Sequence, residues 1–323
     1  MTYTTPTALR IALEQRLLKQ SNDSGISLDR LRRRVIFERV VSRLEVADPG
    51  HWVLKGGMAL EVRLRDEARL TKDIDLGLRD MIDDGEALHE RLVLALAADP
   101  FGDGFVITAE PVTQLMEDIA GHVTWRSRLE AFLAGRPFGR VQLDVSPRGH
   151  ELEDTDFVPL PNSLAFADIN VPVIEIIDVQ RHAAEKLHAM AKDFGDRENT
   201  RVRDLVDIVI LHEHSLLDHQ QLAVATYAVW RERNNEPPPA RLPPLPASWA
   251  LRYEQLAAGH DLATAKFPAA ITLVSRPGRP ASAHDRAVRG ADGEAPDPAA
   301  RRRWVGSGDD CGGAPVVRGS AQG

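Results

Sequence analysis

The sequence predicts an α/β fold, in which a mixed sheet with helices is followed by a helical C-terminal domain and a disordered tail. Three patterns support this prediction. Within residues 47–160, short alternating runs typical of strands are interspersed with helical runs. Within residues 173–275, apolar residues recur mainly at helical spacing. From residue 276 onward, Gly, Ala, Pro and Arg follow one another almost without periodicity, which is typical of a disordered segment.

Residues 1–46 are expected to form two basic helices. Apolar residues recur at helical spacing from Leu9 to Leu17 and again from Leu31 to Leu44, and Ser27 is a suitable cap for the second run. The region holds nine Lys and Arg against five Asp and Glu, and six of its arginines lie between Arg30 and Arg43. These arginines fit either a solvated helix face or a patch that follows the backbone of an RNA.

The remaining elements follow from the same patterns. Strands are expected at residues 51–54, 73–78, 106–108, 123–125 and 141–145. Helices are expected at residues 58–64, 86–97, 179–192, 202–212, 222–233 and 249–258. The chain is therefore expected to contain N-terminal basic helices (1–46), a sheet-containing core (47–160), a helical domain (173–275) and the tail (276–323).

Composition restricts the class of protein. The 323 residues are 43% hydrophobic, which is enough to build a sizeable core. We find neither a run of about 20 apolar residues nor a signal peptide, so we expect a cytoplasmic protein without a membrane span. The single cysteine, Cys311, excludes a disulfide framework and a cysteine-based metal site. The net charge of −8 means that any contact with nucleic acid depends on local basic patches.

The predicted strand at residues 73–78 carries a pair of carboxylates. Because side chains alternate along a strand, Asp73 and Asp75 project from the same face while Ile74 and Leu76 enter the core. Two adjacent negative charges favour a cation between them, and oxygen ligands favour Mg²⁺ or Mn²⁺. An isolated Asp-x-Asp is more often part of a surface strand or turn, so the neighbouring sequence has to support this interpretation.

Two further features suggest phosphate and metal binding. Gly56 and Gly57 connect a predicted strand to a predicted helix, where backbone N–H groups can approach a phosphate, and Lys55 adds a positive charge. An ordinary tight turn explains the glycines equally well. Asp144 is a polar residue within another predicted strand, where it is either a third metal ligand or a strand-end residue.

Four motifs in this order resemble the AbiEii/AbiGii family of nucleotidyltransferase toxins. They are Lys55-Gly56-Gly57-Met58-Ala59-Leu60, residues 69–76 with Thr71-Lys72-Asp73-Ile74-Asp75, residues 185–189 and residues 203–207. The resemblance covers roughly residues 30–215. It implies a polymerase-β-like nucleotidyltransferase fold joined to a helical domain, and a toxin restrained by a cognate antitoxin. It also implies nucleotide transfer from a nucleoside triphosphate (NTP) to RNA, in some relatives to the 3′ end of tRNA.

The resemblance also implies roles for individual residues. Asp73 and Asp75 match the metal-binding pair, to which we add Asp144. Lys186 matches the lysine that contacts the triphosphate, and Asp204 matches the acidic residue of the fourth motif. The residues expected to bind the nucleotide are Lys55, Gly56, Gly57, Thr71 and Lys186. Met58 and Arg203 depart from the small or hydroxyl residue and the lysine usual at their positions, which bears on the shape of the nucleotide pocket.

The helical region leaves some alternatives open. We expect Lys186 to point away from the core toward a cleft, with Asp204 and Asp207 either orienting it or binding the nucleotide. His212-Glu213-His214 suggests a metal site, but adjacent helical positions do not converge, so a helix-end cap is the better interpretation. Two other functions remain compatible with the sequence. One is nucleotide transfer to a small molecule or a protein hydroxyl, and the other is nucleotide or RNA binding without catalysis.

Overall fold

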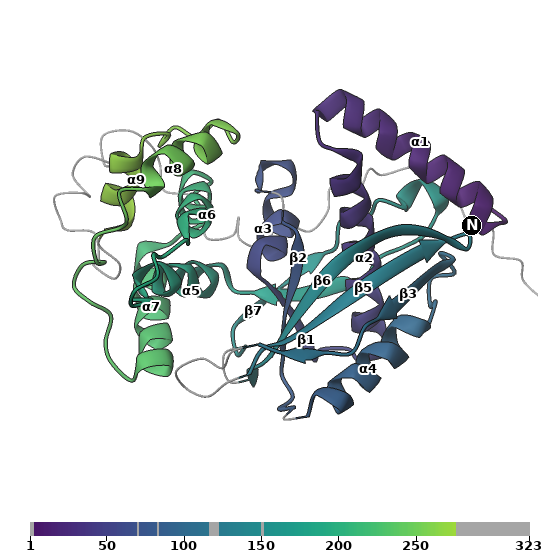
Figure 1. Ribbon diagram of the computed structural model, residues 1–323, viewed down its shortest axis with the longest axis horizontal. Coiled ribbons are helices and arrows are strands. Elements are labelled where there is room, and N and C mark those ends of the chain that lie inside the picture. The colour runs from purple at the N-terminus through teal and green to yellow at the C-terminus, as the bar shows by residue number, and fades with distance from the viewer. Residues whose placement is uncertain (1–2, 70, 83, 116–122, 150–151, 276–323) are drawn as a thin grey trace, which may run out of the picture. The chain divides into compact units, whose positions relative to one another are not determined.

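The computed structural model describes residues 3–275 except residues 70, 83, 116–122 and 150–151 (Figure 1). Its main elements in chain order are α1 (Pro6–Ser24), α2 (Leu28–Ala47), β1 (Trp52–Lys55), α3 (Gly56–Leu64), β2 (Asp73–Leu78), α4 (Gly85–Ala97), β3 (Phe105–Ala109), β4 (Thr113–Gln114), β5 (Trp125–Leu133), β6 (Arg136–Pro147), β7 (Thr155–Pro159), β8 (Val173–Ile177), α5 (Val179–Ala191), α6 (Val202–Glu213), α7 (His219–Asn234), α8 (Trp249–Ala258) and α9 (Phe267–Val274). The predicted disordered tail lies outside the described residues.

An eight-stranded mixed sheet forms the centre of the N-terminal half. Seven strands follow the order β3-β5-β6-β2-β1-β8-β7, and β4 pairs with β5. Two neighbouring pairs, β2 with β6 and β1 with β8, are parallel, whereas the other pairs are antiparallel. The sheet, together with the helices that follow it in the chain, confirms the predicted fold class.

The two N-terminal helices form where the sequence predicts them. The hydroxyl of Thr5 accepts a hydrogen bond from the backbone N–H of Ala8, which caps α1, and Pro6 occupies the first turn. Gly25 ends the helix in the left-handed conformation, with φ of 71°. Ser27 is at the cap position of α2, but its side chain makes no capping hydrogen bond. Helix α2 packs against both β6 and α4, so it covers part of the sheet.

Part of the arginine-rich segment belongs to the core. The prediction of a solvated or RNA-facing stretch is wrong for Arg39 and Arg43, both of which are 0% exposed. Arg43 donates to both carboxylate oxygens of Asp103, over 2.6 and 3.1 Å. Asp103 is equally buried, so the positive charge has a partner inside the protein. Three of the other arginines also pair with carboxylates, namely Arg32 with Glu14, Arg33 with Asp29 and Arg34 with Glu61.

The sheet extends further along the chain than the sequence predicts. Strands β7 and β8 were not predicted, and β8 lies beside β1 within the sheet. Ile174, Ile176 and Ile177 of β8 are buried in the same cluster as the other strands. Strands β5 and β6 contain 9 and 12 residues, far more than the short runs expected. Helix α9 was also not predicted.

Helix α3 takes part in two hydrophobic clusters. Met58, Ala59 and Val62 belong to the cluster of the sheet and its covering helices. Leu60 and Leu64 instead belong to a second cluster with buried residues of the helices from α5 to α9. The N-terminal end of α3 follows β1 directly, so this helix connects the sheet to the helical region. None of the described helices is long and apolar enough to cross a membrane.

Candidate active site

A row of charged side chains crosses four neighbouring strands. Lys55 of β1 pairs with Asp75 of β2, which in turn pairs with Asp144 of β6. Asp144 is opposite Arg126 of β5. Directly paired residues project from the same face of a sheet, so these four side chains share one face. Asp73, two residues before Asp75, projects from this face as well. The structure therefore brings the three predicted metal ligands onto adjacent strands.

The positive charges around Asp73 and Asp75 of β2 do not fully compensate the negative charges of the two carboxylates. Burial raises the pKa of Asp75 to about 6, and the negative charges of Asp144 and Asp73 contribute to this rise. Burial and the charge of Asp144 also raise the pKa of Asp73. The nearby cations Lys55 and Lys186 oppose the rise at Asp75 without cancelling it. A cation bound at this position would relieve the repulsion between the carboxylates.

Asp144 differs from the other two carboxylates because it already has a cationic partner. Arg126 donates to both of its oxygens, each over 2.8 Å. Asp73, Asp75 and Asp144 do not bring one oxygen each within 4.8 Å of one another. Among the described residues, a group of three potential ligands is that compact only at Asp48, His51 and Asp80. Arg126 belongs to none of the sequence motifs. It joins the row only because β5 pairs with β6, so it could not be predicted from the sequence.

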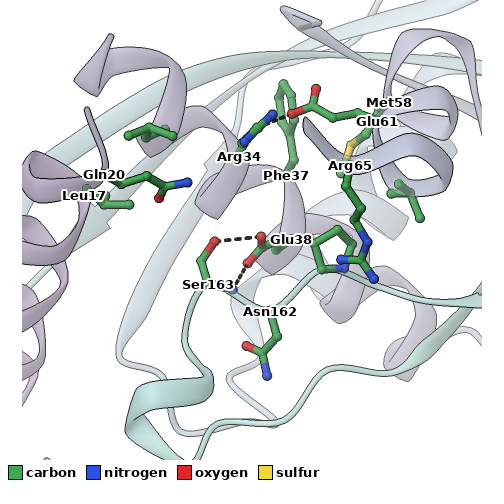
Figure 2. A pocket seen from close by; sticks show the side chains of 13 residues that line it. Leu17, Gln20, Arg34, Phe37, Glu38, Met58, Glu61, Arg65, Asn162 and Ser163 are labelled. Carbon is green, nitrogen blue, oxygen red and sulfur yellow. Dashed lines mark hydrogen bonds and ion pairs between the residues drawn. The ribbon is translucent and has the colours of Figure 1, made fainter. Parts of the chain in front are cut away.

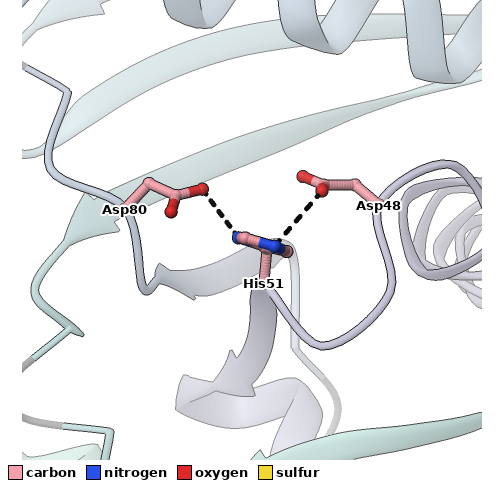
Figure 3. A group of neighbouring side chains, drawn as sticks. All are labelled: Asp48, His51 and Asp80. Carbon is pink, nitrogen blue, oxygen red and sulfur yellow. Dashed lines mark hydrogen bonds and ion pairs between the residues drawn. The ribbon is translucent and has the colours of Figure 1, made fainter.

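The compact group of Asp48, His51 and Asp80 contains no residue of the row; Figure 3 shows its three side chains. Asp80 is five positions after Asp75, which corresponds to roughly 16 Å of extended chain. His51 Nδ1 lies 2.8 Å from Asp80 Oδ2. Arg91 forms ion pairs with both Asp48 and Asp80. Since a guanidinium already neutralises these carboxylates, the group is better described as a surface ion-pair cluster than as a metal site.

The two glycines pack directly against the site residues. Gly56 has φ of 59°, and a Cβ atom at this position would lie 1.8 Å from Asp75 Oδ2. A Cβ atom on Gly57 would lie 2.8 Å from the hydroxyl oxygen of Thr71. The Thr71 hydroxyl donates to the backbone oxygen of Asp73 over 3.3 Å. The turn thus needs glycine for close packing, and the first N–H groups of α3 lie beside the carboxylates.

Lys186 lies in a buried, charged network between α5 and α6. Its Nζ atom donates to Asp204 over 3.0 Å and to Asp207 over 2.8 Å. Arg69 donates to both oxygens of Asp207, over 3.0 and 2.9 Å. Lys186 is only 7% exposed, so its ammonium group lies among these carboxylates and not in open solvent. Its positive charge also lowers the pKa of Asp75. Asp204 and Asp207 were expected either to orient Lys186 or to bind the nucleotide, and these contacts fit the first alternative.

The charges of this network stabilise one another. Burial alone would lower the pKa of Lys186, but Asp207 and Asp204 raise it above its ordinary value. Burial alone would likewise raise the pKa of Asp207, but Lys186 and Arg69 hold it well below the ordinary value. Both groups are therefore charged at neutral pH.

A second ion-pair group connects the row to α5. Lys55 Nζ lies 3.1 Å from Glu185 Oε1, and the same oxygen contacts Arg181 and Arg233. Glu185 and Arg69 were not predicted as site residues, although both occur within the motifs at residues 185–189 and 69–76. The side chains of His212, Glu213 and His214 do not form a common metal site, and the three residues lie at the C-terminal end of α6, as the helix-end interpretation predicts. Glu213 accepts hydrogen bonds from the backbone N–H groups of residues 263 and 264.

Comparison with known proteins identifies the class of this chain as a nucleotidyltransferase. Residues 39–277 match the family described as nucleotidyl transferase AbiEii toxin, type IV TA system. The chain therefore belongs to the AbiEii family of toxins from type IV toxin–antitoxin systems. No curated protein matches the sequence.

Several solved structures are similar to this chain. MenT4, the nucleotidyltransferase toxin Rv2826c from Mycobacterium tuberculosis H37Rv, is 19% identical, with a TM-score of 0.49 over 85% of this chain and 86% of that one. JHP933 from Helicobacter pylori is 19% identical, with a TM-score of 0.40 over 65% and 78% of the two chains. The polyadenylate synthase of Megavirus is 12% identical, with a TM-score of 0.35 over 79% and 42%.

Proposed function

We propose that this toxin transfers a nucleotide from an NTP to an RNA acceptor, such as the 3′ end of a tRNA. The observation that carries the proposal is the carboxylate pair Asp73 and Asp75 beside the Gly56-Gly57 turn. Burial and the negative charge of Asp144 raise the pKa of both carboxylates, so the folded protein holds negative charge that is not fully compensated. A site of this kind suits a reaction that uses a bound cation and a polyphosphate.

The donor atoms of the row fit a divalent metal ion. Asp73 and Asp75 offer hard carboxylate oxygens, which Mg²⁺ and Mn²⁺ prefer. Asp144 would contribute further negative charge and, if released by Arg126, a third ligand. A divalent ion bound there would supply Lewis-acid activation of the α-phosphorus and would stabilise charge on the attacking and leaving oxygens.

Other groups of the chain are suited to a triphosphate. Lys72, Arg126 and Arg203 all lower the pKa of Asp73, which shows that their positive charges act at the row. Lys72 and Arg203 are exposed and can meet an incoming anion. The N–H groups at the start of α3 would bind phosphate oxygens, with Thr71 beside them. We assign Lys186, oriented by Asp204 and Asp207, to neutralising the β- and γ-phosphates.

RNA is the acceptor that this environment favours. Exposed cations next to an acidic metal site can bind the phosphates of an approaching strand while the carboxylates hold the metal. The proposed partners are thus an NTP, RNA and the antitoxin that accompanies a toxin of this class. We further propose action in the cytoplasm, and the separation of the chain into the four regions given above.

The decisive experiment incubates the full chain with each labelled NTP, Mg²⁺ and total RNA. We expect one NTP to label RNA, and Asp73→Asn and Asp75→Asn to abolish labelling while the proteins stay folded. Asp23→Asn, on the exposed side of α1, is the matched control and should label RNA normally. Label found only on a small molecule or a protein would reassign the acceptor. NTP binding without any transfer would indicate a binding protein instead.

A further inference from the structure

Arg126 holds Asp144 apart from the other two carboxylates of the row. Its Nε and Nη2 atoms each donate a hydrogen bond to one oxygen of Asp144, both over 2.8 Å. Two oxygens bound to one Mg²⁺ ion lie at most about 4.2 Å apart, twice the usual metal–oxygen distance. Asp73, Asp75 and Asp144 do not bring one oxygen each within 4.8 Å of one another. In the position fixed by Arg126, Asp144 therefore cannot share one ion with both other carboxylates.

Arg126 can leave Asp144 without losing every hydrogen-bond partner. Gln142, two residues earlier on β6, lies beside the same guanidinium. When its amide oxygen faces Arg126, that oxygen accepts from Nε over 3.1 Å and from Nη2 over 3.0 Å. Nη1 of Arg126 makes no hydrogen bond to the described part of the chain, and 37% of the side chain is exposed. The guanidinium can therefore meet an anion that arrives from solvent.

The two sides of β2 suit different substrates. The Gly56-Gly57 turn follows β1 on one side of β2, whereas Asp144 and Arg126 lie on β6 and β5 on the other side. The turn and Lys186 are assigned above to the phosphates of the NTP. In phosphoryl transfer, the attacking and leaving oxygens lie roughly in line on opposite sides of the phosphorus. When pyrophosphate leaves on the side of the turn, the acceptor hydroxyl therefore enters on the side of Asp144 and Arg126.

Given the function proposed above, we infer that Arg126 binds a phosphate of the RNA acceptor and withholds Asp144 from the metal until that phosphate arrives. A guanidinium binds a phosphate through the same two parallel hydrogen bonds that it makes to a carboxylate, so the phosphate competes directly with Asp144. Once released, Asp144 adds uncompensated negative charge beside Asp73 and Asp75, whose pKa values it already raises. The acceptor and the metal therefore strengthen each other's binding.

The same ion pair distinguishes RNA from acceptors that carry no phosphate. Water, or the hydroxyl of an uncharged small molecule, does not draw Arg126 away from Asp144. The three carboxylates then stay apart, so the NTP is protected from hydrolysis while no RNA is bound. Arg126 is thus a positioning residue that acts through Asp144.

The first test measures Mn²⁺ binding by electron paramagnetic resonance, without nucleotide or RNA. Arg126→Met should raise the affinity about tenfold or more, because it releases Asp144. In the Asp144→Asn background, the same substitution should change the affinity less than about threefold, since only a screened charge is lost. Arg128→Met is the matched control: Arg128 is exposed on the same face of β5 and makes no ion pair with the described residues, so its loss should also stay below about threefold.

The second test measures binding of unfractionated tRNA in EDTA, where no transfer occurs. Arg126→Met should weaken binding and lower the salt dependence by about one counterion, whereas Arg126→Lys should retain most of the affinity. Asp144→Asn alone should tighten binding about fivefold or more, because it no longer competes for Arg126, and should change it little in Arg126→Met. Arg65→Met is the remote control, since Arg65 lines a separate cavity of about 320 Å³ that contains no residue of the row (Figure 2).

Unchanged Mn²⁺ affinity in Arg126→Met would overturn the role of Arg126, as would tRNA binding that does not depend on this residue. An equal gain in Mn²⁺ affinity with and without the Asp144 carboxylate would also overturn it, because only charge repulsion would then have been removed. Thermal unfolding shows that each variant is folded. Both tests omit NTP, so positive results together with a failure to label RNA would refute nucleotide transfer and leave the role of Arg126 in binding intact.

Discussion

Replacing Asp75 by Asn should stabilise the metal-free protein at neutral pH. The native state binds a proton at Asp75 more tightly than the unfolded chain, because burial, Asp144 and Asp73 raise the pKa from 3.8 to about 6. Between pH 4 and 6 the native state therefore carries more protons than the unfolded state. By proton linkage, the free energy of unfolding falls as the pH rises through this interval. Above pH 6 the whole destabilising contribution is present.

The size of the effect follows from the change in proton affinity. Each tenfold change corresponds to 1.36 kcal/mol, so a rise from 3.8 to about 6 corresponds to about 3 kcal/mol. Asp75 is partly exposed, and water screens some of this repulsion. We therefore expect Asp75→Asn to gain about 1 to 3 kcal/mol at pH 7.5. Asn has nearly the same shape as Asp, so it can occupy the space beside Gly56.

Urea denaturation in EDTA, followed by circular dichroism from pH 4 to pH 7.5, measures this difference. The stability advantage of Asp75→Asn should grow with pH and level off above pH 6. The control Asp23→Asn should change the free energy of unfolding by less than about 0.5 kcal/mol at every pH. If Asp75→Asn were no more stable than the wild type at pH 7.5, the charge of Asp75 would be compensated in the native protein, contrary to the raised pKa.

Three further substitutions test other parts of the structure. Lys186→Ala should lower the free energy of unfolding by about 2 to 4 kcal/mol in urea, because it leaves buried carboxylates without their lysine. Lys186→Ala should also severely weaken nucleotide use, and Lys186→Arg should not fully restore it. The measurement is the transfer rate against NTP concentration, and wild-type kinetics in Lys186→Ala would show that Lys186 is not part of the site. Arg43→Met should cost about 3 to 5 kcal/mol by thermal or urea unfolding, since buried Asp103 loses its two hydrogen bonds from Arg43 and keeps only the longer ion pair with Arg39, at 3.6 Å. A loss below about 1 kcal/mol would contradict this. Gly56→Ala should abolish transfer because its Cβ atom would collide with a site carboxylate. Gly135→Ala is its control, with a similar positive φ and open space, and should retain transfer.

The sequence predicts an element correctly where the pattern of that element's own residues is distinctive. The strand at residues 73–78 has the predicted bounds, because alternation of polar and apolar residues is visible directly in the sequence. Strand β8 was missed for the opposite reason. Its five residues are apolar except for the central Glu175, and a short run of this kind cannot be distinguished from the start of a helix.

The partners of the charged groups could not be predicted from the sequence. Asp73, Asp75 and Lys186 were predicted from their motifs, but the partners of these groups depend on pairing between distant segments. Arg126 reaches Asp144 only because β5 and β6 pair in one particular register. Arg43 is buried because Asp103, 60 residues later in the chain, neutralises it. A charge run on an isolated helix gives no sign of such a partner.

Helix α3 also makes the two halves of this protein depend on each other for folding. Leu60 and Leu64 complete the cluster of the later helices, while Met58 and Val62 complete that of the sheet. A fragment ending at Ile177 would expose the first pair to water, and the remaining fragment would lack them. Loss of buried leucines typically costs 2 to 5 kcal/mol each, a large part of the stability of a domain. Unfolding of either half should therefore disrupt the Gly56-Gly57 turn, so proteases that attack an opened helical region would also inactivate the toxin.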